Sequence, residues 1–318
     1  MHPIYVTRQL PQPGLDILQA EAGGFAINAD DHPLTKAELK SAVKGRTAIV
    51  CLLTDAIDAE VLDAAGPKLK IVANVAVGYN NIDVKAATER KVLVTNTPGV
   101  LTETTADLAW ALLLASARRL GESERVLRAG KWPGWGILQF LGQDIYGKTI
   151  GIVGGGRIGH AVARRALGFS MKVLYTSRSP KEDMNALGAR HVDMETCLRE
   201  SDFISLHVPL TAETKHLIGR KEFEQMKPTA HLINTARGPV IDEAALVEAL
   251  KSKRIAGAAL DVYEEEPKVH AGLFECENAV LAPHIGSATT ETRGRMATMA
   301  AQNVVAVLKG QKPLNAVN

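Results

Sequence analysis

The sequence has few cysteines, few aromatic residues and almost no excess of charge of either sign. Its three cysteines, Cys51, Cys197 and Cys276, are odd in number and widely separated, which excludes a disulfide framework and a C-x-x-C metal site. Cys51 lies inside an apolar run, so we expect a buried thiol there. The nine histidines include no H-x-x-x-H or H-E-x-x-H pair, so the sequence predicts no protein-bound catalytic metal.

A formal net charge of +2 over 318 residues excludes a strongly basic protein, and there is no long stripe of lysine and arginine. We therefore expect neither nucleic acid nor an anionic membrane surface as a partner. The most apolar stretch, residues 108–117, is much shorter than the roughly 20 residues that span a bilayer. Residues 1–8 also lack the basic and apolar segments of a secretory signal. These absences predict a cytoplasmic location.

The first part of the chain alternates short runs rich in valine and isoleucine with helix-like segments. Alternation of this kind predicts a parallel sheet with helices on both faces. Strands are expected at residues 4–7, 47–53, 69–75 and 92–96, and helices at 35–43, 58–65 and 83–91. The length of the chain favours two domains.

A second alternation follows a turn rich in Asn, Pro and Gly at residues 95–99. The helix expected after that turn is apolar nearly all round, which predicts a buried position, and Thr104 and Asp107 have capping-box spacing at its start. Strands are then expected at residues 148–153, 171–176, 203–208, 230–234, 255–262 and 279–282. Two such blocks predict an α/β protein with two doubly wound parallel-sheet domains. Residues 132–136 fit neither alternation and predict an extended excursion.

A glycine-rich hexamer connects the first strand of the second block to a helix expected at residues 161–167. Its glycines, Gly154, Gly156 and Gly159, have the G-x-G-x-x-G spacing of a dinucleotide-binding turn. Glycine lets the backbone approach a pyrophosphate, and the N–H groups at the start of the helix point at its charge. We therefore expect these glycines, together with Arg157 and Ile158, to bind a dinucleotide cofactor.

The next strand ends about 20 residues after the glycines, where an NAD-preferring site normally has Asp or Glu for the ribose 2′-OH. Here the sequence is Thr176-Ser177-Arg178-Ser179, with no acid. The forked cation of Arg178 and the hydroxyls of Ser177 and Ser179 suit a 2′-phosphate instead. This predicts a preference for NADPH, with NADH possible if Arg178 is only a solvated loop cation.

Three segments of the second block place a chemically active side chain directly after an expected strand. They carry Arg237 in residues 233–238, the three consecutive glutamates Glu264, Glu265 and Glu266 in 260–267, and His284 in 281–287. Each has a simpler reading: a surface ion pair, a solvated acidic run, or a loop histidine without a special task. Because the carboxyl ends of parallel strands face the ligand crevice, their shared placement favours one common site.

Five ordered motifs together resemble the D-isomer-specific 2-hydroxyacid dehydrogenase family over essentially the whole chain, and within it the glyoxylate/hydroxypyruvate reductase branch. They lie at residues 154–159, 207–211, 236–238, 261–267 and 283–286. The resemblance implies a Rossmann cofactor domain at residues 99–286. It also implies a discontinuous, flavodoxin-like substrate domain made of residues 1–98 and 287–318, with a final helix at 290–308, and a cleft between the domains that closes over the substrate. Members of the family dimerise through the cofactor domain, so a homodimer is expected.

The resemblance also assigns the roles in an NADPH-preferring reduction of a small 2-oxo acid, such as glyoxylate or hydroxypyruvate. Arg237 would grip the substrate carboxylate and polarise the adjacent carbonyl. His284 would be the general acid that protonates the carbonyl oxygen, and Glu266 would orient it and keep it protonated near neutrality. Glu264 and Glu265 would then be surface neighbours.

Further contacts are implied by the resemblance alone. In the first domain the backbone N–H groups near Val77 and Gly78 would hold the substrate carboxylate, and Leu53 would form an apolar wall. The remaining cofactor contacts would be Val208, Pro209, Thr214, Thr235, Ala236, Asp261 and Gly286.

Three positions depart from the family pattern. Asn80 stands where relatives usually have Asp, and Gly155 where they more often have Leu. Gln139 stands where close relatives have Trp within residues 132–140, which puts a cross-subunit substrate contact in doubt. Two alternatives stay open: an NADH-linked D-lactate, phosphoglycerate or phosphite dehydrogenase, and a non-catalytic nucleotide-sensing module like the corepressors that share this fold.

Overall fold

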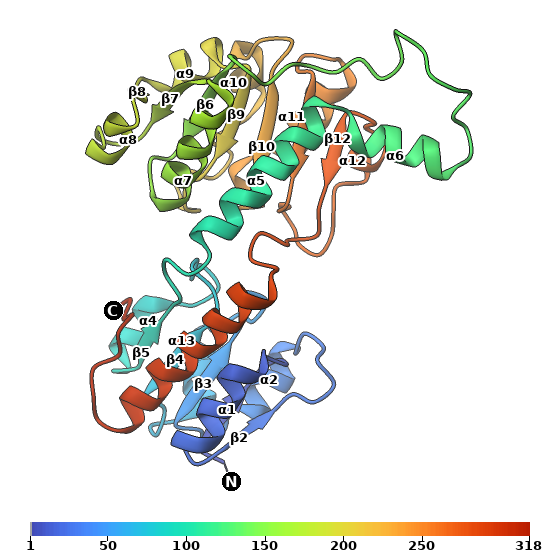
Figure 1. The fold of residues 1–318 in the computed structure, drawn as a ribbon. Coiled ribbons are helices and arrows are strands. Elements are labelled where there is room, and N and C mark those ends of the chain that lie inside the picture. The colour runs from blue at the N-terminus through green and yellow to red at the C-terminus, as the bar shows by residue number, and fades with distance from the viewer. Residues whose placement is uncertain (1) are drawn as a thin grey trace. The chain divides into compact units, whose positions relative to one another are not determined.

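The computed structural model describes residues 2–318, which form two compact units. The first unit combines Met1–Leu101 with Ser287–Asn318, and the second is Thr102–Gly286. Each unit is a parallel β-sheet covered by helices on both faces, as Figure 1 shows. The α/β class with two doubly wound parallel sheets is therefore confirmed. In the described part of the chain no helix is both long and apolar enough to cross a membrane.

The sheet of the first unit has five strands in the order β2-β1-β3-β4-β5, which is the flavodoxin-like order. Its strands are β1 (Ile4–Val6), β2 (Phe25–Ile27), β3 (Ala48–Cys51), β4 (Ile71–Asn74) and β5 (Leu93–Thr95). Helices α1 (Gln12–Glu21) and α13 (Thr290–Leu308) cover one face, and α2 (Lys36–Ala42), α3 (Ala59–Ala65) and α4 (Val84–Glu89) cover the other. The pair α1 and β2 was not predicted from the sequence.

The last segment of the chain joins the first unit because α13 packs tightly on α1. A Cβ built at Gly14 of α1 would lie only 2.7 Å from Ala297 of α13, so glycine allows the two helices to touch. The smaller helices of this unit begin at side-chain caps, with Thr35 and Glu38 forming a capping box and Asp58 capping α3.

The sheet of the second unit has seven strands in the order β12-β11-β10-β9-β6-β7-β8, a Rossmann-type order extended by one strand. Its strands are β6 (Thr149–Val153), β7 (Lys172–Thr176), β8 (Arg190–His191), β9 (Phe203–Leu206), β10 (His231–Asn234), β11 (Gly257–Leu260) and β12 (Ala279–Leu281). Helices α5 (Thr102–Ala117) and α7 (Arg157–Ala166) cover one face, and α9 (Met194–Glu200), α10 (Arg220–Gln225) and α11 (Glu243–Lys251) the other. Shorter elements are α6 (Leu120–Arg128), α8 (Glu182–Ala186), α12 (Ala271–Phe274) and the 3-10 turns Leu167–Phe169 and Gly238–Val240.

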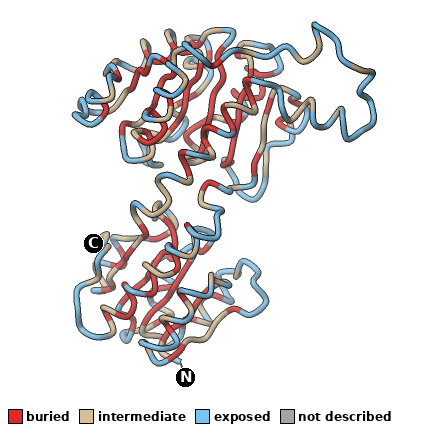
Figure 2. The backbone as a smooth tube through the Cα atoms, viewed as in Figure 1, coloured by how far each residue is buried: buried red, intermediate tan, exposed pale blue. Residues whose placement is uncertain are grey.

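In the second unit, many of the buried residues lie in the strands of the sheet and in helix α5 (Figure 2). The buried position predicted for α5 is confirmed, but the capping box is wrong. The helix already begins at Thr102, so Thr104 and Asp107 lie inside its first turns. All three cysteines are buried free thiols, as the sequence predicted for Cys51. Residues 131–148 form no helix or strand and make the expected excursion.

Candidate active site

The glycine-rich turn connects β6 to α7, and two of its glycines are required by close backbone packing. Gly154 has φ +110°, and a Cβ there would lie 2.6 Å from the carbonyl oxygen of His207. A Cβ at Gly159 would lie 2.0 Å from the carbonyl oxygen of Gly154. At Gly156, in contrast, a Cβ would meet no atom within 4 Å, so the backbone faces open space.

The start of α7 is suited to a phosphate group. Gly156 is the N-cap residue and supplies no side-chain hydrogen bond to the helix. The first N–H groups of a helix have no partner within it, and they favour negative charge. The start of α7 can therefore hold the pyrophosphate of a dinucleotide with the backbone of Gly156, Arg157 and Ile158, in agreement with the prediction from the sequence.

The end of β7 carries no carboxylate, as expected from the sequence. Ser177 Oγ donates a hydrogen bond to the carbonyl oxygen of Ser179 at 2.6 Å, which tightens this turn. Arg178 is exposed, and its charge is one of the influences that lower the pKa of Glu213, after the hydrogen bonds from Thr211 and the backbone. The turn thus presents a cation beside the sheet edge that carries the glycines.

Other residues assigned to the cofactor differ in whether their polar groups have hydrogen-bond partners. Thr214 Oγ1 donates to the carbonyl oxygen of Pro209 at 2.6 Å and accepts from Thr211 N at 2.8 Å, so it closes the loop that contains Val208 and Pro209. Ala236 N donates to Asn234 Oδ1 at 3.0 Å. Thr235 Oγ1 is buried and, within residues 2–318, has no hydrogen-bond partner. That unsatisfied hydroxyl suits a bound ligand.

Two of the three predicted catalytic residues are directly hydrogen-bonded. His284 Nδ1 lies 2.7 Å from Glu266 Oε2, and Glu266 Oε1 accepts from Tyr263 N at 3.0 Å. Burial alone would raise the pKa of Glu266, but His284, the Tyr263 N–H and the charge of Arg237 together lower it. Glu266 is therefore an ionised partner that orients His284 through Nδ1, which leaves Nε2 for a ligand.

Arg237 follows β10 and is close enough to Glu266 for their charges to interact. Burial lowers the pKa of Arg237, and the charge of Glu266 opposes that shift. Arg237 Nη1 donates to the carbonyl oxygen of Ala236 at 2.7 Å. The next residue, Gly238, lets its loop contact the Glu266 loop, because a Cβ there would lie 1.8 Å from the carbonyl carbon of Tyr263. Arg237, Glu266 and His284 thus come from neighbouring loops at one sheet edge.

The backbone of His284 is held in an unusual conformation. Its φ of +54° lies in the left-handed region, which non-glycine residues rarely adopt. Asp261 stabilises the turn: its carbonyl oxygen accepts from His284 N at 2.9 Å, and its carboxylate accepts from Ile285 N at 2.7 Å and Gly286 N at 2.8 Å. Asp261 and Gly286, assigned to the cofactor by resemblance, therefore also shape the turn that presents His284.

Glu264 corrects one prediction, because it is not a mere surface neighbour. Its Oε2 accepts from Glu243 N at 3.3 Å, and its own N–H donates to Glu243 Oε1 at 2.6 Å. Its other oxygen pairs with His216. This exchange anchors the loop of Glu266 to the start of α11. Glu265 is exposed, as expected, and pairs with Lys268.

Tyr263 is a further contributor that the sequence did not reveal. Its hydroxyl donates to the carbonyl oxygen of Ala282 at 2.9 Å and so joins the loops of Glu266 and His284. A tyrosine three positions before a candidate acid gives no such signal in the sequence, because its partner is 19 residues away.

In the first unit, the predicted substrate residues follow β3 and β4. Leu53, two residues beyond the end of β3, is 38% exposed. The carbonyl oxygen of Val77 accepts from Asn96 Nδ2 at 2.8 Å, and that of Gly78 from Asn74 Nδ2 at 2.9 Å. Among the described residues, the N–H groups of Val77 and Gly78 have no acceptor. Two successive unpaired N–H groups can bind an anion.

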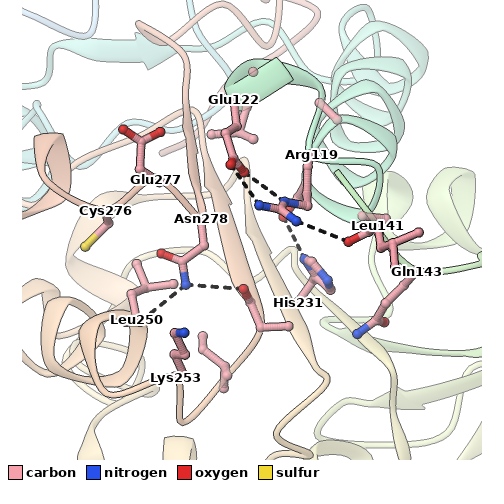
Figure 3. A pocket seen from close by; sticks show the side chains of 18 of the residues that line it. Arg119, Glu122, Leu141, Gln143, His231, Leu250, Lys253, Cys276, Glu277 and Asn278 are labelled. Carbon is pink, nitrogen blue, oxygen red and sulfur yellow. Dashed lines mark hydrogen bonds and ion pairs between the residues drawn. The ribbon is translucent and has the colours of Figure 1, made fainter. Parts of the chain in front are cut away.

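A separate cavity of about 710 Å³ lies in the second unit, and Figure 3 shows side chains that line it. His231 is at the amino end of β10, and Asn278 directly precedes β12. The cavity is therefore at the opposite ends of the strands from Arg237 and His284. We do not include it in the active site.

The described part of the chain contains no group of three or more His, Cys, Asp or Glu side chains placed to hold a metal ion.

Comparison with known proteins gives a consistent result. A family model described as "D-isomer specific 2-hydroxyacid dehydrogenase, NAD binding domain" matches residues 110–286. A glyoxylate reductase from Thermococcus litoralis is 53% identical, covering 99% of this chain and 96% of that protein. One from Korarchaeum cryptofilum is 54% identical, with coverages of 99% and 95%. Among solved structures, an NADPH-dependent glyoxylate/hydroxypyruvate reductase from Sinorhizobium meliloti, in complex with NADP and malonate, is 34% identical with a TM-score of 0.86, covering 100% of this chain and 97% of that one.

Proposed function

This chain belongs to the D-isomer-specific 2-hydroxyacid dehydrogenase family, and from that premise we propose that it is an NADPH-preferring reductase of small 2-oxo acids, with glyoxylate and hydroxypyruvate as substrates. The observation that carries this proposal is the Glu266–His284 pair at 2.7 Å beside the charge of Arg237. The names of the relatives support the substrate class. A panel of 2-oxo acids assayed with both cofactors tests it.

In the proposed mechanism each side chain has one task. Arg237 binds the substrate carboxylate with its planar fork and polarises the adjacent carbonyl. When bound, the reduced nicotinamide supplies a hydride to the carbonyl carbon. His284, held by Glu266 through Nδ1, donates a proton from Nε2 to the carbonyl oxygen. In the reverse direction His284 accepts that proton as a base.

The first unit contributes binding in this proposal. The N–H groups of Val77 and Gly78, which have no acceptor among the described residues, donate hydrogen bonds to the substrate carboxylate, and Leu53 limits the size of the substrate's other substituent.

Cofactor preference gives the first test. We expect kcat/KM with NADPH to exceed that with NADH, because the turn after β7 carries Arg178 and no carboxylate. Arg178→Ala should raise KM for NADPH about 10-fold, since one charged hydrogen bond to the 2′-phosphate is lost, and leave KM for NADH within about twofold. Steady-state kinetics with both cofactors measures this.

Arg199→Ala is the matched control, because Arg199 is an exposed arginine on α9 of the same unit. It should change neither KM. A clear NADH preference of the parent enzyme would contradict the cofactor proposal and favour an NADH-linked dehydrogenase.

We also propose a homodimer formed through the second unit. The excursion exposes several large apolar side chains, among them Trp135 at 79%, Ile137 at 72% and Leu138 at 78%. Neighbouring exposed apolar side chains of this kind mark interaction sites. Trp132 Nε1 donates to Gln139 Oε1 at 3.1 Å, so Gln139 is engaged within its own segment.

Substitution of one of these side chains tests the dimer. Leu138→Asp should shift the mass in solution from two chains toward one chain of 34.1 kDa, because a charge is placed in the apolar contact. Light scattering after size exclusion measures the mass. Leu314→Asp, which changes a leucine equally exposed at 79% in the other unit, should leave it unchanged. A parent protein of one chain would refute the proposal outright.

The non-catalytic alternative has a distinct signature. A nucleotide-sensing module would bind NADPH yet reduce none of the 2-oxo acids in the panel. The presence of Arg237, Glu266 and His284 in one arrangement argues against it.

A further inference from the structure

Two asparagines at the carboxyl edge of the first unit's sheet have side chains that bond to each other. Asn74 is the last residue of β4 and is fully buried, and Asn81 lies in the loop that follows. Asn74 Nδ2 donates to Asn81 Oδ1 at 3.2 Å, and Asn81 Nδ2 lies 3.4 Å from Asn74 Oδ1. A partly buried amide pair of this kind holds its surroundings in one arrangement, because breaking it leaves unsatisfied polar groups, above all on the fully buried Asn74.

The same pair connects two loops. Asn81 Nδ2 also donates to the carbonyl oxygens of Leu52 at 3.0 Å and Asp55 at 3.1 Å, on either side of Leu53. Asn74 Nδ2 donates to the carbonyl oxygen of Gly78 at 2.9 Å. The loop that carries Leu53 and the loop that carries Gly78 are therefore tied to the same pair of asparagine side chains.

A third asparagine completes the arrangement. Asn96 Nδ2 donates to the carbonyl oxygen of Val77 at 2.8 Å, and Thr97 N donates to that of Ala76 at 2.9 Å. In a planar trans peptide, the C=O of one residue points away from the N–H of the next. Fixing the carbonyls of Ala76 and Val77 therefore aims the N–H groups of Val77 and Gly78 in the opposite direction.

From these contacts we infer that Asn74, Asn81 and Asn96 are positioning residues for substrate binding. They touch no substrate themselves. Asn96 directs the N–H group of Gly78, beside the Val77 N–H group that the backbone of Thr97 directs, and Asn74 and Asn81 tie this carboxylate cradle to the loop of Leu53. This inference rests on the proposed reduction of a 2-oxo acid and names residues that set its KM.

The chain offers a matched control in Asn28. This asparagine is also buried, 7% exposed, and directly follows strand β2 of the same sheet. Its Nδ2 likewise donates to two carbonyl oxygens, of Thr7 at 3.1 Å and His32 at 2.8 Å. Neither of these two hydrogen bonds involves residues 76–78, so the substitution costs similar hydrogen bonds without disturbing the cradle.

The test compares Asn74→Asp, Asn96→Ala and Asn28→Asp. Asn74→Asp replaces a donor with an oxygen that repels the carbonyl of Gly78, and Asn96→Ala releases the carbonyl of Val77. Both should raise KM for glyoxylate about 10-fold, with kcat within about threefold and KM for NADPH unchanged, because a ground-state binding contact is weakened. The dissociation constant of oxalate, measured by calorimetry, should rise in parallel. Asn28→Asp should leave both the KM for glyoxylate and the dissociation constant of oxalate unchanged.

If Asn74→Asp does not fold, as thermal unfolding would show, Asn96→Ala carries the test, since its side chain is only partly buried. An unchanged glyoxylate KM and oxalate affinity in the folded variants overturns the inference, and so does an equal rise in Asn28→Asp. A parent enzyme that reduces no 2-oxo acid contradicts the proposed function instead, and the oxalate measurement still decides whether the asparagines shape the anion site.

Discussion

His284→Ala is expected to lower kcat by about 10²-fold or more, the usual loss when a general acid is removed. The variant takes away the proposed proton donor, whose Nδ1 lies 2.7 Å from Glu266 Oε2, and water is a poorly positioned substitute. The effect should appear in both kcat and kcat/KM for glyoxylate, because proton donation is needed in the transition state. Binding of NADPH, followed by fluorescence, should change little.

The control for this variant is His270→Ala, which removes an exposed histidine of the same unit whose side chain caps α12. It should keep kcat within about twofold of the parent. An unchanged kcat in His284→Ala would remove His284 from the mechanism, whatever its contact with Glu266.

Arg237→Lys is expected to raise KM for glyoxylate by about 10- to 100-fold, the range that corresponds to loss of one charged hydrogen bond. A lysine keeps the positive charge but replaces a planar fork with a single point, so it cannot bind a carboxylate in the same bidentate way. Arg237 is partly buried beside Glu266. Losing the bidentate contact there weakens substrate binding strongly, because the substrate carboxylate has little bulk water to replace the lost hydrogen bond. Because the charge remains, the change in kcat should be the smaller of the two, and the two parameters measured over a range of glyoxylate concentrations separate them.

Arg220→Lys supplies the comparison, since Arg220 is an exposed member of an ion pair with Glu248 on α10 and α11. Its kinetic parameters should equal those of the parent. If Arg237→Lys moves neither KM nor kcat, Arg237 has a structural task only.

The contrast between Glu266 and Glu264 shows how far sequence reasoning reaches. Both follow β11, and the family pattern separated them by their distance from Pro267. The contact of Glu266 with His284 agrees with the role assigned to it. The partners of Glu264 are Glu243 and His216, which lie 21 and 48 residues away, and no local pattern identifies them. The sequence could therefore indicate which glutamate is the better catalytic candidate, but it could not identify the residues to which each glutamate is hydrogen-bonded.

The asparagines of the first unit show the same limit. Asn74 lies within a run that predicts a buried strand, and the one available signal is a polar amide at its carboxyl end. The positioning role inferred for Asn74 depends on its contacts with Asn81 and, through Asn81, with the loop of Leu53. These residues lie near Asn74 only when β3 and β4 pair.

The sequence by itself determined the α/β class, the family and the turn that suits a dinucleotide, and it singled out Arg237, Glu266 and His284 as the candidate catalytic side chains. These follow from residue type and spacing along the chain, which act over one strand and one turn. Only the tertiary structure decided how those side chains are held. The left-handed turn of His284 on Asp261, the Glu243–Glu264 exchange and the asparagine pair are contacts between residues far apart in sequence. Such contacts exist only after the strands have assembled, because sheet pairing is what brings their loops to one edge.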